Sequence, residues 1–238
     1  ITADNSTIYA SYFSQMDAYS EGYAGIGVWR AAFKPFVDRI ADNDIRLQWF
    51  CCDRSTGMDT EDKDGKPIRV TLLRDTETPA SVEYQAVKFI GTGRENIQAG
   101  TFSGWELGDY IYMRSEEAYL IKIEALAHKN SPDAVTELEN FMKTRQPDYD
   151  YTFTNKADLI EEIIYQKRVE FWGEGLEYID NRRLNIPVDR TDETWGAENN
   201  NHFSAAKFRY NQEERPFLYQ LPISEIENNS QISPSDQN

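Results

Sequence analysis

The chain has 238 residues, of which 39% are hydrophobic, 28% charged and 13% aromatic. These proportions are typical of a globular protein and exclude a wholly disordered chain. With 25 basic and 41 acidic residues the formal net charge is −16, which disfavours nucleic acid and anionic membrane surfaces as partners because both are themselves negatively charged.

No apolar run approaches the roughly 18 residues that a membrane-spanning helix needs, and the first residues lack the basic-then-apolar pattern of a secretion signal. The sequence therefore indicates a soluble mature protein or a chain that starts after its targeting segment. Cys51 and Cys52 are adjacent, so they cannot form an ordinary long-range disulfide with each other and leave the redox compartment open.

Composition divides the chain at about residue 105 into a loop-rich region, 1–104, and a helical region, 105–238. In the first region, residues 31–40 predict one short helix broken by Pro35, and the alternating run 68–73 predicts a strand. Glycines and turn residues separate these short segments. Since long connections of this kind often carry binding function, the first region is the candidate for ligand binding.

The helical region opens with a pattern over residues 112–127 whose buried face is predicted to hold Tyr112, Tyr119, Ile123 and Leu126. A short loop follows, in which Ser131 suits an N-cap and Pro132 the first helical position. The second helix is predicted to stop before Pro147 and to carry Val135, Leu138, Met142 and Arg145 on one side. Together they predict an antiparallel helical hairpin, its backbones brought close by the small residues Ala118, Ala125 and Ala134.

Asn155 is predicted to cap a third helix, with Asp158 three residues later. The buried stripe of this helix is predicted to comprise Leu159, Ile160, Ile163, Ile164 and Phe171. Two glycines, Gly173 and Gly175, interrupt the pattern, which continues over residues 176–183. Residues 185–218 are predicted to be loop, and residues 221–229 an extended segment that leads into one helical turn.

The motifs of common catalytic and metal sites are absent: the sequence has no HExxH, no Gly-x-Ser-x-Gly and no P-loop. His128 and His202 are predicted to be surface residues. The acidic run 59–65 fails as a calcium loop because Thr60 and Thr71 would stand where carboxylates are required. A carboxylate pair for glycoside hydrolysis can be drawn anywhere among 41 acidic residues, so it carries no weight. We therefore predict no catalytic residue, no metal and no cofactor.

Charges of alternating sign lie among large apolar residues between Ile164 and Arg183. Glu170 and Glu174 are four residues apart on one helix face, and this like-charge pair costs stability unless cations lie against it. Arginines can supply those cations by bidentate pairing. We predict a structural network that fixes how the helices dock, with direct ligand contact as the alternative, comprising Arg46, Arg114, Arg168, Glu170, Glu174, Asp180 and Arg183.

This run resembles the C-terminal signature of the SusD/RagB family of Bacteroidetes outer-membrane nutrient-binding lipoproteins. The positions that match the signature are Arg168, Glu170, Glu174, Gly175, Asp180 and Arg183. The sequence departs from it at Gln166, Lys167, Glu177 and Leu184, which predicts a weaker charge network. Other segments match in the family's order: residues 44–46, 88–89, 114–125, 221–228 and 237–238.

The resemblance implies a mainly α fold with a helical hairpin, long irregular loops and a few short strands, continuous through both regions. It also implies that the chain is the C-terminal half of a longer lipoprotein. The missing half would carry a lipidated cysteine and tetratricopeptide-like helices, and would leave exposed apolar surface here. By the same resemblance, the protein is non-enzymatic and lies at the bacterial cell surface. There it binds an oligosaccharide or similar nutrient and works with a SusC-like TonB-dependent transporter.

Aromatic residues are frequent in the glycine-rich first region, and sugar rings stack their C–H faces on such side chains. Tyr23 and Trp29 lie in a glycine-containing segment and are the first candidates for a glycan platform, with Tyr12 as a third. The alternative is that these residues are core aromatics. Two other functions stay open: a helical-repeat adaptor that binds a protein or peptide, and an unrecognised glycosidase.

Overall fold

The computed structural model describes residues 32–51, 58–61, 67–70, 85–86, 88, 112–214 and 221–236. The chain forms two compact units, residues 1–174 and residues 175–238. The compositional boundary near residue 105 lies outside the described residues. The three candidate platform residues, Tyr12, Tyr23 and Trp29, lie outside them as well.

The first unit begins with short elements. The helix predicted within residues 31–40 is α2 (Lys34–Asp38), and Pro35 lies in its first turn rather than breaking it, because a proline there removes an N–H that has no helical partner. The next two elements are the 3₁₀ helix η2 (Ile45–Trp49) and the strand β1 (Phe50–Cys51).

Two antiparallel ribbons accompany these elements. Strand β1 pairs with β4 (Gln85–Ala86), and β2 (Met58–Glu61) pairs with β3 (Pro67–Val70). The strand predicted over residues 68–73 is therefore present, although its described part begins at Pro67 and ends at Val70.

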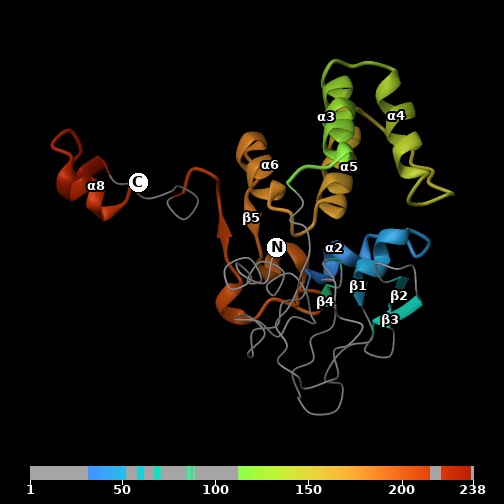
Figure 1. The fold of residues 1–238 in the computed structure, drawn as a ribbon, viewed down its shortest axis with the longest axis horizontal. Helices are drawn as coiled ribbons and strands as arrows, with labels where there is room; N and C mark the ends of the chain where they lie inside the picture. The colour runs from blue at the N-terminus through green and yellow to red at the C-terminus, as the bar shows by residue number, and fades with distance from the viewer. Residues whose placement is uncertain are drawn as a thin grey trace, which may run out of the picture. The chain divides into compact units, whose positions relative to one another are not determined.

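Three longer helices follow: α3 (Ser115–His128), α4 (Asp133–Met142) and α5 (Lys156–Glu170). Helix α3 packs against both α4 and α5, and Figure 1 shows the hairpin that α3 and α4 form. Across this hairpin Glu137 accepts hydrogen bonds from the Tyr119 hydroxyl at 2.5 Å and from Lys122 Nζ at 2.7 Å. The mainly α fold and the helical hairpin are confirmed.

The buried face of α3 differs from the predicted one. It comprises Leu120, Ile123, Glu124 and Ala127, whereas Tyr112 precedes the helix and is 93% exposed. The prediction followed the aromatic residues, but α3 is covered from two sides, by α4 and by α5. That second neighbour also explains the buried Glu124, which pairs with Lys167 of α5 at 3.2 Å.

The three small residues of the hairpin do not share one interface. Ala134 is fully buried, as predicted for a close approach of α3 and α4. Ala118 and Ala125 are exposed, so they lie on the face of α3 that is turned away from its neighbours. The prediction that both alanines face α4 is therefore wrong.

Helix α5 begins as predicted, because Asn155 caps it. The Asn155 side chain accepts a hydrogen bond from the Asp158 amide at 3.0 Å, and Asp158 in turn accepts from the Thr154 amide at 2.9 Å. The first of these bonds satisfies an amide that the helix leaves free in its first turn, and the second ties the residue before the cap to the same turn. Leu159, Ile163 and Phe171 of the predicted stripe are buried.

Replacing Asn155 by Ala is expected to lower the free energy of unfolding by about 1 kcal/mol, since the Asp158 amide loses its acceptor. Urea denaturation followed by circular dichroism measures the change. The control is Asn199→Ala, which removes an exposed side chain that donates to its exposed neighbour Glu198 and is expected to change stability by less than about 0.5 kcal/mol. Equal effects of the two substitutions would contradict the capping role.

Helix α5 also packs on the short elements at the start of the unit. Buried residues of both form one cluster: Ala32, Val37, Ile40, Phe50, Tyr165 and Val169. Aromatic rings extend it, since Phe50 meets Phe36 and Trp172 edge to face at centroid distances of 6.1 and 5.4 Å. Such pairs contribute beyond their buried area, so this cluster holds η2 and β1 against α5.

The second unit begins at Gly175, whose φ of +85° is a left-handed conformation that glycine adopts without strain. Its elements are α6 (Leu176–Leu184), β5 (Val188–Asp189), α7 (Asp192–Trp195), η4 (Ser204–Ala206), β6 (Arg209–Tyr210), α8 (Ile223–Asn228) and η6 (Pro234–Asp236). Strands β5 and β6 pair antiparallel. Helix α8 is the single helical turn predicted within residues 221–229.

Among the helices that the structure describes, none combines the length and the apolar composition needed to cross a membrane.

Candidate functional site

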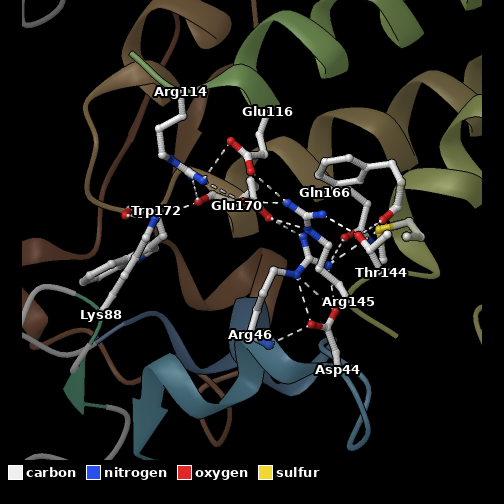
Figure 2. A network of polar contacts seen from close by, with 12 residues as sticks. Asp44, Arg46, Lys88, Arg114, Glu116, Thr144, Arg145, Gln166, Glu170 and Trp172 are labelled. Atoms are coloured by element: carbon white, nitrogen blue, oxygen red, sulfur yellow. Dashed lines mark hydrogen bonds and ion pairs between the residues drawn. The ribbon is translucent and has the colours of Figure 1, made fainter. Parts of the chain in front are cut away.

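Glu170, at the end of α5, lies at the centre of a buried charge network (Figure 2). Its carboxylate is 3% exposed and contacts three guanidinium groups. Arg114 reaches Oε1 at 2.9 Å, Arg145 reaches both oxygens at 3.2 Å, and Arg46 reaches Oε2 at 3.4 Å.

Burial alone would raise the pKa of Glu170. The hydrogen bonds from Arg145 and Arg114, together with the positive charges of Arg145 and Arg46, outweigh that effect and hold the pKa below its ordinary value. Glu170 is therefore an ionised anchor whose acceptor sites are occupied by cationic donors.

Arg46, in η2, connects this centre to the N-terminal elements. Its side chain is 1% exposed and donates to both carboxylate oxygens of Asp44, the closer at 2.6 Å. The Asp44 side chain also accepts from the Arg46 amide at 2.9 Å, which caps η2. A hydrogen bond of 2.5 Å joins Arg46 Nη2 to the Gln166 side-chain oxygen.

Gln166 extends the network along α5. Its oxygen accepts from Arg46 while its Nε2 donates to Glu162 at 2.6 Å. Glu162 also receives hydrogen bonds from Arg39 at 2.7 Å and from the Tyr149 hydroxyl at 3.2 Å. A glutamate at position 166 would place a second carboxylate against Glu162, so an amide, which both donates and accepts, suits this position.

Glu174 forms the second centre, four residues beyond Glu170. Its carboxylate pairs with Arg114 at 2.9 and 3.1 Å and with Lys88 at 2.6 Å. Lys88 Nζ lies 4.6 Å from the centre of the Trp49 ring. Burial lowers the pKa of Lys88 to about 8, although the hydrogen bond and charge of Glu174 oppose the shift.

The network balances its charges. Glu116 completes it, with oxygens 3.6 Å from both Arg114 and Arg145. Four cations thus lie against four anions: Asp44, Arg46, Lys88, Arg114, Glu116, Arg145, Glu170 and Glu174. They come from η2, from residue 88, from the start of α3, from the segment after α4 and from the end of α5. Each member of the network pairs with another member. The network therefore stabilises the packing of these segments against one another.

Of the predicted network residues, the structure brings together Arg46, Arg114, Glu170 and Glu174. Arg168 lies partly buried on α5 and is not one of the cations on Glu170 or Glu174. In the second unit, Arg183 pairs with Asp180 at 2.7 Å.

Sequence reasoning missed several members of this network: Asp44, Lys88, Glu116, Arg145 and Gln166. Asp44 stands two residues before Arg46, and this spacing allows a local ion pair. It was the sequence feature from which Asp44 could have been predicted as a member of the network. The sequence places Arg145 on the same side of the second helix as three apolar residues, without indicating a charged partner. Two of the departures from the signature, Gln166 and Lys167, have charged partners.

Among the residues that the structure describes, no group of three or more histidine, cysteine, aspartate or glutamate side chains is placed to hold a metal ion. His128 is half exposed at the end of α3. Burial, with the charges of Arg190 and Lys207, lowers the pKa of His202 below its ordinary value.

Comparison with known proteins gives one family and one fold. The model of the SusD family matches residues 30–238. A solved structure described as a SusD-like carbohydrate binding protein from Bacteroides vulgatus is similar, with a TM-score of 0.58 and 20% sequence identity. The match covers 94% of this chain and 45% of that one, so the chain spans less than half of its length. A comparison with curated protein sequences gave no match.

Proposed function

The chain belongs to the SusD family, and we propose that it forms part of a protein that captures an oligosaccharide at the bacterial cell surface. The observation that supports this most is the family match over residues 30–238, joined to the fold shared with a carbohydrate binding protein. The mechanism is binding without bond chemistry. The captured sugar passes to a SusC-like TonB-dependent transporter in the outer membrane. A lipid anchor holds the full-length binding protein at the same membrane.

The charge of the chain bears on the class of sugar. At a net charge of −16 the chain repels anionic ligands at long range, so we propose a neutral oligosaccharide rather than a uronic acid polymer. Neutral sugars are recognised by aromatic stacking and by hydrogen bonds from amide, carboxylate and basic side chains. The proposed platform residues are Tyr23 and Trp29, with Tyr12 as a third candidate.

The buried network supports a structural role for the charged residues and a ligand-binding role for aromatic residues. Glu170 and Glu174 are the carboxylates that the sequence singled out, and each is occupied by arginine or lysine donors. A carboxylate held in this way is suited to fixing the scaffold. Ligand binding is then proposed to lie with aromatic residues elsewhere in the chain.

Calorimetric titration with neutral oligosaccharides tests the proposal. Trp29→Ala is expected to weaken binding severalfold or more, because the sugar loses the ring face on which it is proposed to stack. Phe203→Ala serves as the control, since Phe203 is a 74% exposed aromatic residue of the second unit, and it is expected to leave binding unchanged.

The outcomes separate the competing functions. If Trp29→Ala leaves sugar binding unchanged, Trp29 is not part of the binding platform. Capture of a defined peptide without any sugar binding would favour a helical-repeat adaptor. Release of reducing sugar by the purified protein would favour a glycosidase.

A further inference from the structure

Trp195, the last residue of α7 in the second unit, is a large aromatic residue at the protein surface, with 37% of it exposed. The one polar atom of its side chain, Nε1, donates to the Asp189 main-chain carbonyl at 2.9 Å. Because that atom is engaged, further contacts of the ring are apolar. The same hydrogen bond fixes the ring relative to β5, which contains Asp189.

The Asp189 carbonyl that holds Trp195 belongs to an ordered part of the second unit. The Asp189 side chain accepts hydrogen bonds from the Thr191 amide at 3.0 Å and from the hydroxyls of Thr191 and Thr194, both at 2.7 Å. Asp189 is also paired with Arg209 in the β5–β6 ladder. The orientation of the Trp195 ring is therefore set before a ligand arrives, and a ring held in this way loses little conformational freedom on binding.

The turn that follows Trp195 is anchored at its far end by Asn200, which is 6% exposed. Asn200 Nδ2 donates to the Arg190 main-chain carbonyl at 3.0 Å and to the Asp192 carboxylate at 2.8 Å. Between the two anchors, residues 197–199 are exposed. Trp195 and these residues thus form an ordered turn whose side chains are accessible to solvent.

Two polar side chains of this turn lie close to Trp195. Gly196 has a φ of +76°, and a Cβ at that position would lie 2.7 Å from Glu198 Oε1, so the Glu198 carboxylate lies against the backbone next to Trp195. Asn199 Nδ2 donates to the same carboxylate oxygen at 3.4 Å. A ring that can stack on sugar C–H groups thus lies beside a carboxylate and an amide that can bind sugar hydroxyls.

The extent of this surface favours a sugar over a protein partner. A stable protein interface buries about 800 Å² on each partner, several times the roughly 150–250 Å² of a whole aromatic side chain. One sugar ring, by contrast, covers one face of an indole. Isolated exposed aromatic residues are common on protein surfaces; Trp195 differs from them in its fixed ring and in the polar groups beside it.

We propose that Trp195, Glu198 and Asn199 form a second sugar-binding site, in which one ring of a neutral oligosaccharide stacks on the indole. The Glu198 carboxylate accepts hydrogen bonds from sugar hydroxyls, and the Asn199 amide both donates and accepts. The ligand class rests on the proposed function. The site itself does not use the proposed platform residues Tyr23 and Trp29.

NMR titration of the full chain tests this site, with the tightest binder among neutral gluco-, galacto-, manno- and xylohexaose as the probe. The indole N–H signal of Trp195, identified by its absence in Trp195→Phe, is expected to shift in the wild type and equally in Trp29→Ala. Asn199→Ala is expected to move the midpoint of this titration to severalfold higher sugar concentration, because the sugar hydroxyls lose the amide. Phe203→Ala is the matched control, since it removes a 74% exposed ring from the same unit, and it is expected to leave the midpoint unchanged.

The outcomes distinguish this site from the proposed function. A Trp195 signal that stays in place while the wild type binds the sugar would overturn the second site and leave the proposed function intact. An unchanged midpoint in Asn199→Ala would overturn it as well, and so would a shift that vanishes in Trp29→Ala, because both tryptophans would then belong to one site. If the wild type binds none of the hexasaccharides, the proposed function is wrong and the second site with it.

Discussion

Replacing Glu170 by Gln is expected to lower the free energy of unfolding of the first unit by about 3–5 kcal/mol. The carboxylate is 3% exposed and lies against Arg46, Arg114 and Arg145. The glutamine side chain has the same size but no charge. The three arginines then lack one of their anions in a buried site where water cannot replace it. Removing one partner of a buried ionic group costs far more than the group's net contribution, because the remaining charges stay desolvated.

Urea denaturation measures this loss. Glu139→Gln provides the same chemical change at an exposed pair, where Lys143 and Glu139 are 49% and 35% exposed. It is expected to cost less than about 0.5 kcal/mol. A loss below about 1 kcal/mol in Glu170→Gln would contradict the central position that we assign to this carboxylate.

The dependence of stability on pH shows whether the loss in Glu170→Gln comes from the missing negative charge. The pKa of Glu170 is lower in the folded protein than its ordinary value of 4.5, so the folded state binds this proton less readily than the unfolded state. The stabilisation is therefore complete above the ordinary pKa and is lost as the pH falls through the folded-state pKa. In Glu170→Gln this part of the acid destabilisation is expected to disappear, so the two stability curves should converge at low pH.

The features predicted best from the sequence are those that local chemistry decides. The Asn155 cap requires only a side-chain acceptor three residues before a free amide, so residues 155–158 identify it without the rest of the fold. The helical hairpin likewise follows from two periodic segments and a short loop. The buried face of α3 could not be predicted in this way, because it depends on α5, which begins 28 residues after α3 ends.

The network shows the same limit. Glu170 and Glu174 indicate from their spacing alone that cations must lie nearby, and two of those cations, Arg46 and Arg114, were predicted. Arg145 and Lys88 lie 25 and 82 residues from Glu170, and nothing in their local sequence indicates that Glu170 or Glu174 is their partner. Partners that meet only through tertiary packing leave no periodic signal.

Gln166 illustrates how a departure from a family pattern can fit its surroundings. Read from the sequence, the loss of a carboxylate predicted a weaker network. In the structure, the amide joins two centres, accepting from Arg46 and donating to Glu162. The substitution keeps the contact to arginine and avoids a like-charge pair four residues apart on α5.

The position of Arg46 explains why a second large loss of stability is expected there. This guanidinium is the contact through which η2 reaches α5, since it bonds Asp44 on one side and Gln166 and Glu170 on the other. Its 1% exposure leaves no room for water to replace those contacts. The short elements at the start of the unit otherwise rely on the apolar cluster around Phe50.

Arg46→Met is expected to cost about 3–5 kcal/mol in the free energy of unfolding. Methionine fills much of the space but leaves the buried Asp44 carboxylate, among the residues that the structure describes, with the amide of residue 46 as its one donor. Arg209→Met removes an arginine that is 54% exposed and 3.4 Å from Asp189, and it is expected to cost less than about 1 kcal/mol.

The double variant Arg46→Met with Asp44→Asn separates lost charge pairing from lost packing. If the unpaired Asp44 carboxylate causes most of the loss, its neutral amide should recover more than about 1 kcal/mol relative to Arg46→Met alone, because the desolvated charge is gone. If the double variant is no more stable than the single one, the loss comes from packing at η2, and the electrostatic account of Arg46 is wrong. Thermal denaturation of the wild type, Arg46→Met, Asp44→Asn and the double variant gives the coupling energy between the two positions.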